Sequence, residues 1–310
     1  MTITLPVATE SPRLVLARLE VVRILRHPAF VGFAALTVLL HVVAFIELAG
    51  DRSNLLYNTV ANGPPFWVPA AVGLAIAAGL TATRARRDDL DELLDASPVV
   101  RSTRIDALLL AVTGVGALAA TGVVAFMTVT RGWNGLPMLV EPDRTVWVDY
   151  PLGTDIDPTD VTPSIFELAT GPMALIVWGL VGVVVARYLG SRILIVAAPL
   201  LGFIQLIIVT WTLRSPTRWF WPFTHSAQQV GWVDVADDGS GISVAGGFNV
   251  AATGWHVLFL LGLATVLAVA ARWHRATSAR LVWLALAGVV LAGVAGVAQV
   301  EAYIPDLQSP

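Results

Sequence analysis

Seven long apolar segments dominate the sequence, and short stretches that carry most of the charges separate them. A helix needs about 20 mainly apolar residues to cross the hydrocarbon core of a bilayer. The chain is 56% hydrophobic and only 13% charged, which is well below the charged fraction of a soluble domain. We therefore predict an all-α polytopic membrane protein whose apolar segments lie at residues 29–48, 66–82, 106–129, 173–186, 193–213, 255–271 and 281–298.

The arginines predict how these segments are oriented, because cytosolic loops are enriched in basic residues. With the N-terminus in the cytosol, 14 of the 19 arginines lie on the inner side. Two topologies stay open, a bundle of six or of seven transmembrane helices, because the last segment can either span the membrane or re-enter it. The predicted parts are a cytosolic N-terminus (1–28), a transmembrane domain (29–298) with a cytosolic loop (83–105) and outer loops (131–170 and 214–254), and an extracytoplasmic tail (299–310).

The residues that the sequence lacks exclude several kinds of chemistry. It has no cysteine, so it has neither disulfides nor thiolate ligands for a metal. Every basic residue is an arginine, and a P-loop ATPase requires a lysine at the phosphates. The predicted spans also contain no paired carboxylates, histidine-rich pattern or nucleophile with a base. We expect no catalytic residue, metal or cofactor in this chain. A net charge of −3 gives no indication of nucleic-acid binding.

The longest charged stretch runs from residue 84 to residue 104 and predicts a short helix. Its leucines are spaced to share one helix face: Leu90, Leu93 and Leu94. Acidic residues fill its first turn, where the helix dipole favours negative charge: Asp88, Asp89, Asp91 and Glu92. Pro98 ends the helix, because proline disfavours helical geometry at the residue before it. The leucine face either docks a soluble protein or rests on the membrane surface.

A second amphipathic helix is predicted from Pro12 to Arg26. Four charged residues share one side of it: Arg13, Glu20, Arg23 and Arg26. Apolar residues lie largely opposite: Leu14, Val21, Val22 and Leu25. This pattern is typical of a helix that lies along the membrane surface, and a cytosolic extension of the first span is the alternative.

Small residues four positions apart permit close approach of two helices in lipid. Such pairs occur at Ala75 and Gly79, Gly116 and Ala120, and Ala292 and Gly296. They indicate either packing inside the bundle or an interface with another subunit. His41, within the first span, is either a packed and hydrogen-bonded residue or a proton carrier or ligand.

The outer loops contain three patterns of their own. Residues 145–150 alternate as a strand does. The aromatic cluster at 219–223 indicates an interfacial belt or a short helix that dips back into the outer leaflet. His225 and His256 fall on the outer side, although no motif supports a shared haem.

Two of these stretches resemble the membrane subunit of a type-2 ABC exporter. Residues 20–30, EVVRILRHPAF, are similar to the elbow helix of that family, on which Glu20, Arg23 and Arg26 lie. Residues 86–101, RRDDLDELLDASPVVR, are similar to its cytosolic coupling helix. The resemblance implies that this helix docks on an ATPase through Asp88, Leu90, Asp91, Glu92, Leu93, Leu94 and Arg101. The seventh segment and the long loop at 131–170 depart from the pattern of the family.

The resemblance implies a multi-pass permease of the cell membrane, in contact with lipid, that works with a second permease chain, identical or related. ATP and magnesium would bind to a separate cytosolic P-loop ATPase. The alternative from another class is a membrane anchor or assembly subunit that holds a different cytosolic protein through the same leucines.

Overall fold

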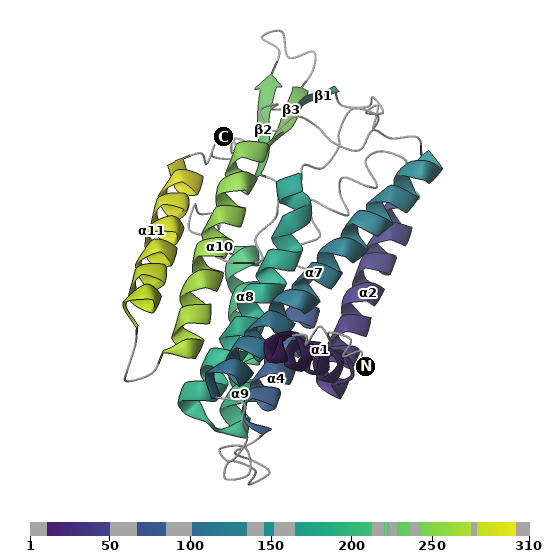
Figure 1. Ribbon diagram of the computed structural model, residues 1–310. Helices are drawn as coiled ribbons and strands as arrows, with labels where there is room; N and C mark the ends of the chain where they lie inside the picture. Colours follow the sequence, from purple (N-terminus) through teal and green to yellow (C-terminus); the bar gives the residue numbers. More distant parts are fainter. Residues whose placement is uncertain are drawn as a thin grey trace, which may run out of the picture.

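The computed structural model describes residues 11–49, 67–84, 101–134, 146–151, 165–212, 220, 222, 228–235, 242–273 and 278–301. Within these residues the chain forms eight helices and three strands (Figure 1). The helices are α1 (Pro12–Leu25), α2 (Pro28–Ala49), α4 (Val68–Ala82), α7 (Arg101–Asn134), α8 (Ile165–Leu189), α9 (Arg192–Thr212), α10 (Val250–Arg272) and α11 (Ala279–Glu301). The strands are β1 (Val146–Pro151), β2 (Gln228–Val235) and β3 (Ile242–Asn249).

Each of the seven predicted apolar segments coincides with a helix, so the chain is a helical, multi-pass membrane protein. Four helices are long and apolar enough to cross a membrane: α7, α8, α10 and α11. Helices α1 and α2, which are bent by 64° relative to each other, add a fifth crossing if they form one span. Helix α4 and the Arg192–Gly202 part of α9 are apolar but shorter.

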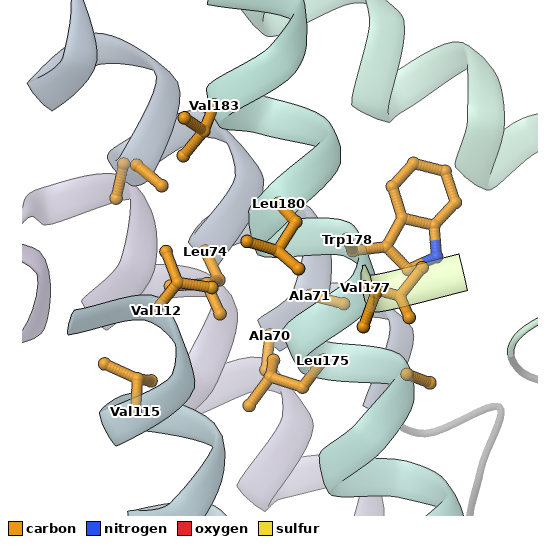
Figure 2. Packing of buried hydrophobic residues seen from close by; sticks show 14 of the residues in the cluster. Ala70, Ala71, Leu74, Val112, Val115, Leu175, Val177, Trp178, Leu180 and Val183 are labelled. Carbon is orange, nitrogen blue, oxygen red and sulfur yellow. The ribbon is translucent and has the colours of Figure 1, made fainter. Parts of the chain in front are cut away.

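Helices α4 and α8 form the centre of the bundle. Every residue of α4 from Val68 to Gly79 is buried, and α2, α8 and α9 surround it. Leu74 of α4, Val112 of α7 and Leu175 of α8 lie in one apolar cluster (Figure 2). The sequence permits this burial because α4 consists mainly of alanine, glycine and valine, whose small side chains let neighbouring backbones approach.

Glycines mark the closest approaches between these helices. A Cβ atom at Gly182 of α8 would collide with the carbonyl oxygen of Ala75 on α4. A Cβ atom at Gly79 would lie 2.7 Å from Cγ2 of Ile195 on α9. Gly116 of α7 faces Ile176 of α8 in the same way. For these positions, packing inside the bundle is confirmed as the role of the small residues.

Helices α10 and α11 form the far edge of the bundle. Helix α10 packs against α8, and α11 packs mainly against α10 (Figure 1). A Cβ atom at Gly262 would lie 2.6 Å from the backbone nitrogen of Ala292, so these two helices also meet at their backbones. The opposite side of α11 is exposed and apolar, as lipid contact requires: Val282, Trp283, Leu286, Val289, Val290, Val294 and Val297.

Two local features fix the central helices. Thr37 of α2 is buried, and its Oγ1 accepts a hydrogen bond of 2.9 Å from the backbone N–H of Ala70, in the first turn of α4. That N–H has no partner within its own helix. Gly190 ends α8 with a positive φ of 64°, which glycine adopts without strain, and the chain then turns into α9.

Three antiparallel strands in the order β1-β3-β2 lie at one end of the bundle (Figure 1). Val146 of β1 pairs with Phe248 of β3, and Gln228 of β2 pairs with Asn249 of β3. The alternation at residues 145–150 is confirmed as a strand by β1. The sheet adds a small β element, which the prediction of an all-α chain did not include.

Candidate functional site at the arginine-rich end

Helix α1 lies at the end of the bundle opposite the sheet, next to the start of α7 and the end of α4 (Figure 1). Helix α4 ends and helix α7 begins at this end of the bundle, so both ends of the segment that joins them lie here (Figure 1). This segment carries the predicted docking residues. Six of them lie outside the described residues: Asp88, Leu90, Asp91, Glu92, Leu93 and Leu94. The seventh, Arg101, is the first residue of α7.

The helix predicted from Pro12 is present as α1. Its charged residues do not all face outward, because the side chain of Glu20 is largely buried. Ala17 and Ile24 are buried in the face that packs against α7. Glu20 belongs to the same face; its side chain is only 16% exposed and forms an ion pair with Arg23. Arg26 follows the last turn and is exposed. The inward face of α1 therefore combines small apolar residues with a carboxylate.

Asp106, near the start of α7, connects three helices through its carboxylate. Its Oδ1 lies 2.9 Å from Nε of Arg272, the last residue of α10. Its Oδ2 lies 3.8 Å from Nε of Arg13 on α1. The Asp106 side chain is 11% exposed, so the pair with Arg272 is partly shielded from water. A partly buried carboxylate between two guanidinium groups holds α1, α7 and α10 together by charge.

In the sequence, Asp106 marks only the start of the third predicted apolar segment, and its role in joining three helices is not predicted. An acidic residue at the end of an apolar segment is a signal that it needs a cationic partner. The partners themselves are not apparent from sequence, because Arg13 and Arg272 come from distant parts of the chain.

A second set of contacts joins the ends of α8 and α10. Nη2 of Arg187 donates a hydrogen bond of 2.7 Å to the carbonyl oxygen of Trp273. The hydroxyl of Tyr188 donates a hydrogen bond of 2.9 Å to the carbonyl oxygen of Ala270. The last carbonyl groups of a helix lack their usual i+4 donors, and both side chains donate to carbonyl groups at the end of α10. The carbonyl oxygen of Ala270 also accepts a hydrogen bond of 3.1 Å from the backbone N–H of Trp273. Together with Asp106, the two side chains join the ends of α8 and α10 and the start of α7.

The opposite end of the α10–α11 pair is held by buried polar side chains and by an aromatic contact. His256 and Gln299 are fully buried, with His256 Nδ1 3.1 Å from Gln299 Oε1. Nε2 of His256 lies 3.4 Å from the carbonyl oxygen of Pro222. The ring of Phe220 packs edge-on against Phe259 of α10. This part of the aromatic cluster therefore lies against the helices. His225, the other predicted outer histidine, lies outside the described residues.

His41 on α2 is packed and hydrogen-bonded. Its Nδ1 lies 2.8 Å from the carbonyl oxygen of Thr37, and its ring packs edge-on against Trp67. The backbone contact and the aromatic neighbour support the structural interpretation of this residue.

Among the residues that the structure describes, no three histidine, aspartate or glutamate side chains form a group that could hold a metal ion. Comparison with family models, with curated proteins and with solved structures finds no match to this chain. The function therefore has to be argued from the sequence and from the contacts at the arginine-rich end.

Proposed function

We propose that this chain is the permease subunit of an ATP-driven ABC exporter. A separate P-loop ATPase would dock on the 88–97 helix, and a second permease chain would complete the translocation path. The observation that best supports this proposal is the set of ion pairs that Asp106 forms with Arg13 and Arg272, which we call the Asp106 junction. It lies five residues after Arg101, at the start of the helix that directly follows the proposed docking segment.

The junction provides a physical route for coupling. A force that an ATPase applies to the segment between α4 and α7 acts on the start of α7. Asp106 links that position to Arg13 on α1 and to Arg272 on α10. ATP binding in the partner would shift the bundle between two states only through contacts that differ between them. The ion pairs of Asp106 are candidates for such contacts.

The proposed topology has seven crossings, formed by α2, α4, α7, α8, α9, α10 and α11. The arginine-rich end then faces the cytosol and the sheet faces outward in the cell membrane, in agreement with the distribution of arginines. Helix α1 takes the part of the elbow helix, and its 64° bend to α2 supports that assignment. Leu90, Leu93 and Leu94 would fill an apolar groove on the ATPase, while Asp88, Asp91, Glu92 and Arg101 would orient the contact by charge.

The test is purification of the tagged chain from its native host in mild detergent, followed by mass spectrometry of the proteins that accompany it. We expect a P-loop ATPase in stoichiometric amount, and we expect Leu93→Arg to remove it. Ser102→Arg is the matched control, because Ser102 is exposed and its replacement adds the same charge at the start of α7 without changing the leucine face.

The alternative function makes a different prediction in the same experiment. A membrane anchor or assembly subunit would retain a cytosolic protein that is not an ATPase. That result, or the absence of any partner under conditions that preserve complexes, would contradict the exporter proposal.

A further inference from the structure

His27 lies at the bend between α1 and α2, and its backbone takes part in both helices. Its N–H donates a hydrogen bond of 3.0 Å to the carbonyl oxygen of Ile24, in the last turn of α1. Its carbonyl oxygen accepts a hydrogen bond of 2.9 Å from the N–H of Val31, in the first turn of α2. The 64° bend between the two helices therefore passes through His27.

The side chain of His27 adds a third contact at the same place. Its Nδ1 accepts a hydrogen bond of 3.3 Å from the backbone N–H of Ala29, the second residue of α2. The first N–H groups of a helix have no partner within that helix, so the imidazole acts as an N-terminal cap. Because a backbone N–H can only donate, Nδ1 must carry a lone pair, and the proton of the neutral ring must be on Nε2.

The two helices are anchored separately on either side of this cap. On α1, Ile24 is fully buried in the face that packs against α7. On α2, Phe30 is buried, and a Cβ atom at Gly73 of α4 would lie 2.9 Å from the carbonyl oxygen of Ala29. The start of α2 thus rests on the backbone of α4. The cap of His27 lies between these two anchored segments.

A proton on Nδ1 would remove the cap, because the imidazolium has no lone pair there. It would also place a positive charge at the N-terminus of α2, where the helix dipole is already positive. The charged side chains on the elements around the bend are mainly cationic: Arg23 and Arg26 on α1, Arg84 after α4, and Arg104 on α7. The acidic residues on these helices, Glu20 and Asp106, form ion pairs with arginines. Neither α4 nor the first turns of α2 carry a charged side chain.

We propose that His27 is a proton-sensitive joint between α1 and α2. The neutral imidazole caps α2 and holds the bend. When Nδ1 takes up a proton, the hydrogen bond to Ala29 is lost and the first turn of α2 loosens, while α1 stays on α7. The half-buried side chain is open to protons from the solution at the arginine-rich end. This device does not depend on the proposed exporter function, because it requires only the packing of α1 and α2.

The test measures the distance between α1 and α2 in the full chain in nanodiscs, at about pH 8 and about pH 5, which bracket the range where an imidazole changes charge. Because the sequence has no cysteine, Val15→Cys and Val38→Cys place one spin label on an exposed position of each helix. We expect a narrow distance distribution at the higher pH and a broader one at the lower pH. His27→Ala, which removes the cap without adding charge, should give the broad distribution at both.

His27→Asn is the matched variant, because asparagine also caps helix N-termini and does not ionise. It should keep the narrow distribution at both pH values. His274→Gln removes a different histidine, which follows Trp273 in the sequence, and should respond to pH as the wild type does.

Amide hydrogen exchange provides an independent reading of the cap. Loss of an N-cap changes a local helix equilibrium by roughly five-fold, so the first turn of α2 should exchange roughly five-fold faster in His27→Ala than in His27→Asn at the same pH. Equal exchange in these two variants would overturn the inference. So would a wild-type distance distribution that is the same at both pH values, or a pH response in His27→Asn equal to that of the wild type.

Discussion

Helices α8 and α11 are both apolar enough to span a membrane, yet they occupy opposite situations in the bundle. In α8, 61% of the apolar window is buried inside the protein, whereas in α11 only 17% is buried. Hydrophobicity therefore does not determine which helix is central. In lipid an apolar side chain gains little by leaving acyl chains for protein, so position depends on how closely the backbones fit.

Glycine placement accounts for the difference. Gly179 and Gly182 of α8 face α4 and α7, where a Cβ atom would collide with Leu74, Val112 and the backbone of Ala75. On α11, Gly288 faces Gly262 of α10, whereas a Cβ atom at Gly293 would meet no neighbouring atom within 4 Å. Helix α8 therefore packs against several helices, whereas α11 packs mainly against α10 through one of its faces.

The largest effect is expected from Gly182→Val on α8. The new side chain would overlap the carbonyl group of Ala75, and backbone atoms cannot yield as a flexible side chain can. We expect a loss of about 3 kcal/mol or more in the free energy of unfolding. The measurement is thermal unfolding in detergent, followed by the intrinsic fluorescence of the tryptophans.

The matched control is Gly293→Ala on α11, which adds one methyl group where no neighbour stands. Alanine favours a helix over glycine by roughly 0.5–1 kcal/mol, so stability should stay the same or rise slightly. If both substitutions shift the unfolding temperature equally, close backbone approach does not distinguish the two helices.

The sequence predicted the existence of the helices well, because an apolar run of transmembrane length has few other stable conformations in lipid. It also identified Ala75, Gly79 and Ala292 as positions of close approach. It did not show which helices meet there, since a small residue carries no information about its partner. The importance of Gly182 depends on Ala75 being opposite, and this pairing arises only in the folded bundle.

Of the candidate site, the sequence predicted the surface helix but not the ion pairs that join it to other helices. The charge pattern predicted a helix from Pro12 to Arg26, and α1 covers Pro12–Leu25, with Glu20 and Arg23 on the helix and Arg26 directly after its end. The ion pairs of Asp106 could not be predicted, because residues far apart in sequence meet only once α1, α7 and α10 have packed. The leucine face at residues 90–94 lies outside the described residues and stays a prediction.

A smaller effect is expected from Gly262→Leu, which would push α11 away from α10. A Cβ atom at Gly262 would lie 2.6 Å from Ala292 N and 2.8 Å from Gly288 O. We expect a loss of about 2 kcal/mol, confined largely to the α10–α11 pair, because α11 has little contact elsewhere.

Spin labels on both helices can measure this separation. Leu261→Cys on α10 and Val290→Cys on α11 are exposed positions, and the chain has no other cysteine. The distance distribution between the labels should broaden and lengthen in the Gly262→Leu background. An unchanged distribution would mean that α11 is held by something other than its backbone contact with α10.

The smallest effect is expected from removing the ion pairs of Asp106, through which the end of the peripheral helix α10 is attached to the start of α7. Asp106→Asn removes the charge that Arg272 and Arg13 share, and we expect a loss of about 1–2 kcal/mol. Arg13→Gln should cost about 0.5 kcal/mol or less, because its side chain is 57% exposed and its nitrogen is 3.8 Å from the carboxylate.

The two arginines can be separated by a double-mutant cycle and by salt. Asp106→Asn combined with Arg272→Gln should show a coupling energy larger than the same cycle with Arg13→Gln, since Arg272 lies 2.9 Å from the carboxylate. Raising the ionic strength should weaken the Arg13 coupling more, because its more exposed charge is better screened. Equal couplings would mean that Asp106 holds α1 as firmly as α10. The ion pair with Arg272 would then attach the end of α10 to α7 no more strongly than the ion pair with Arg13 attaches α1.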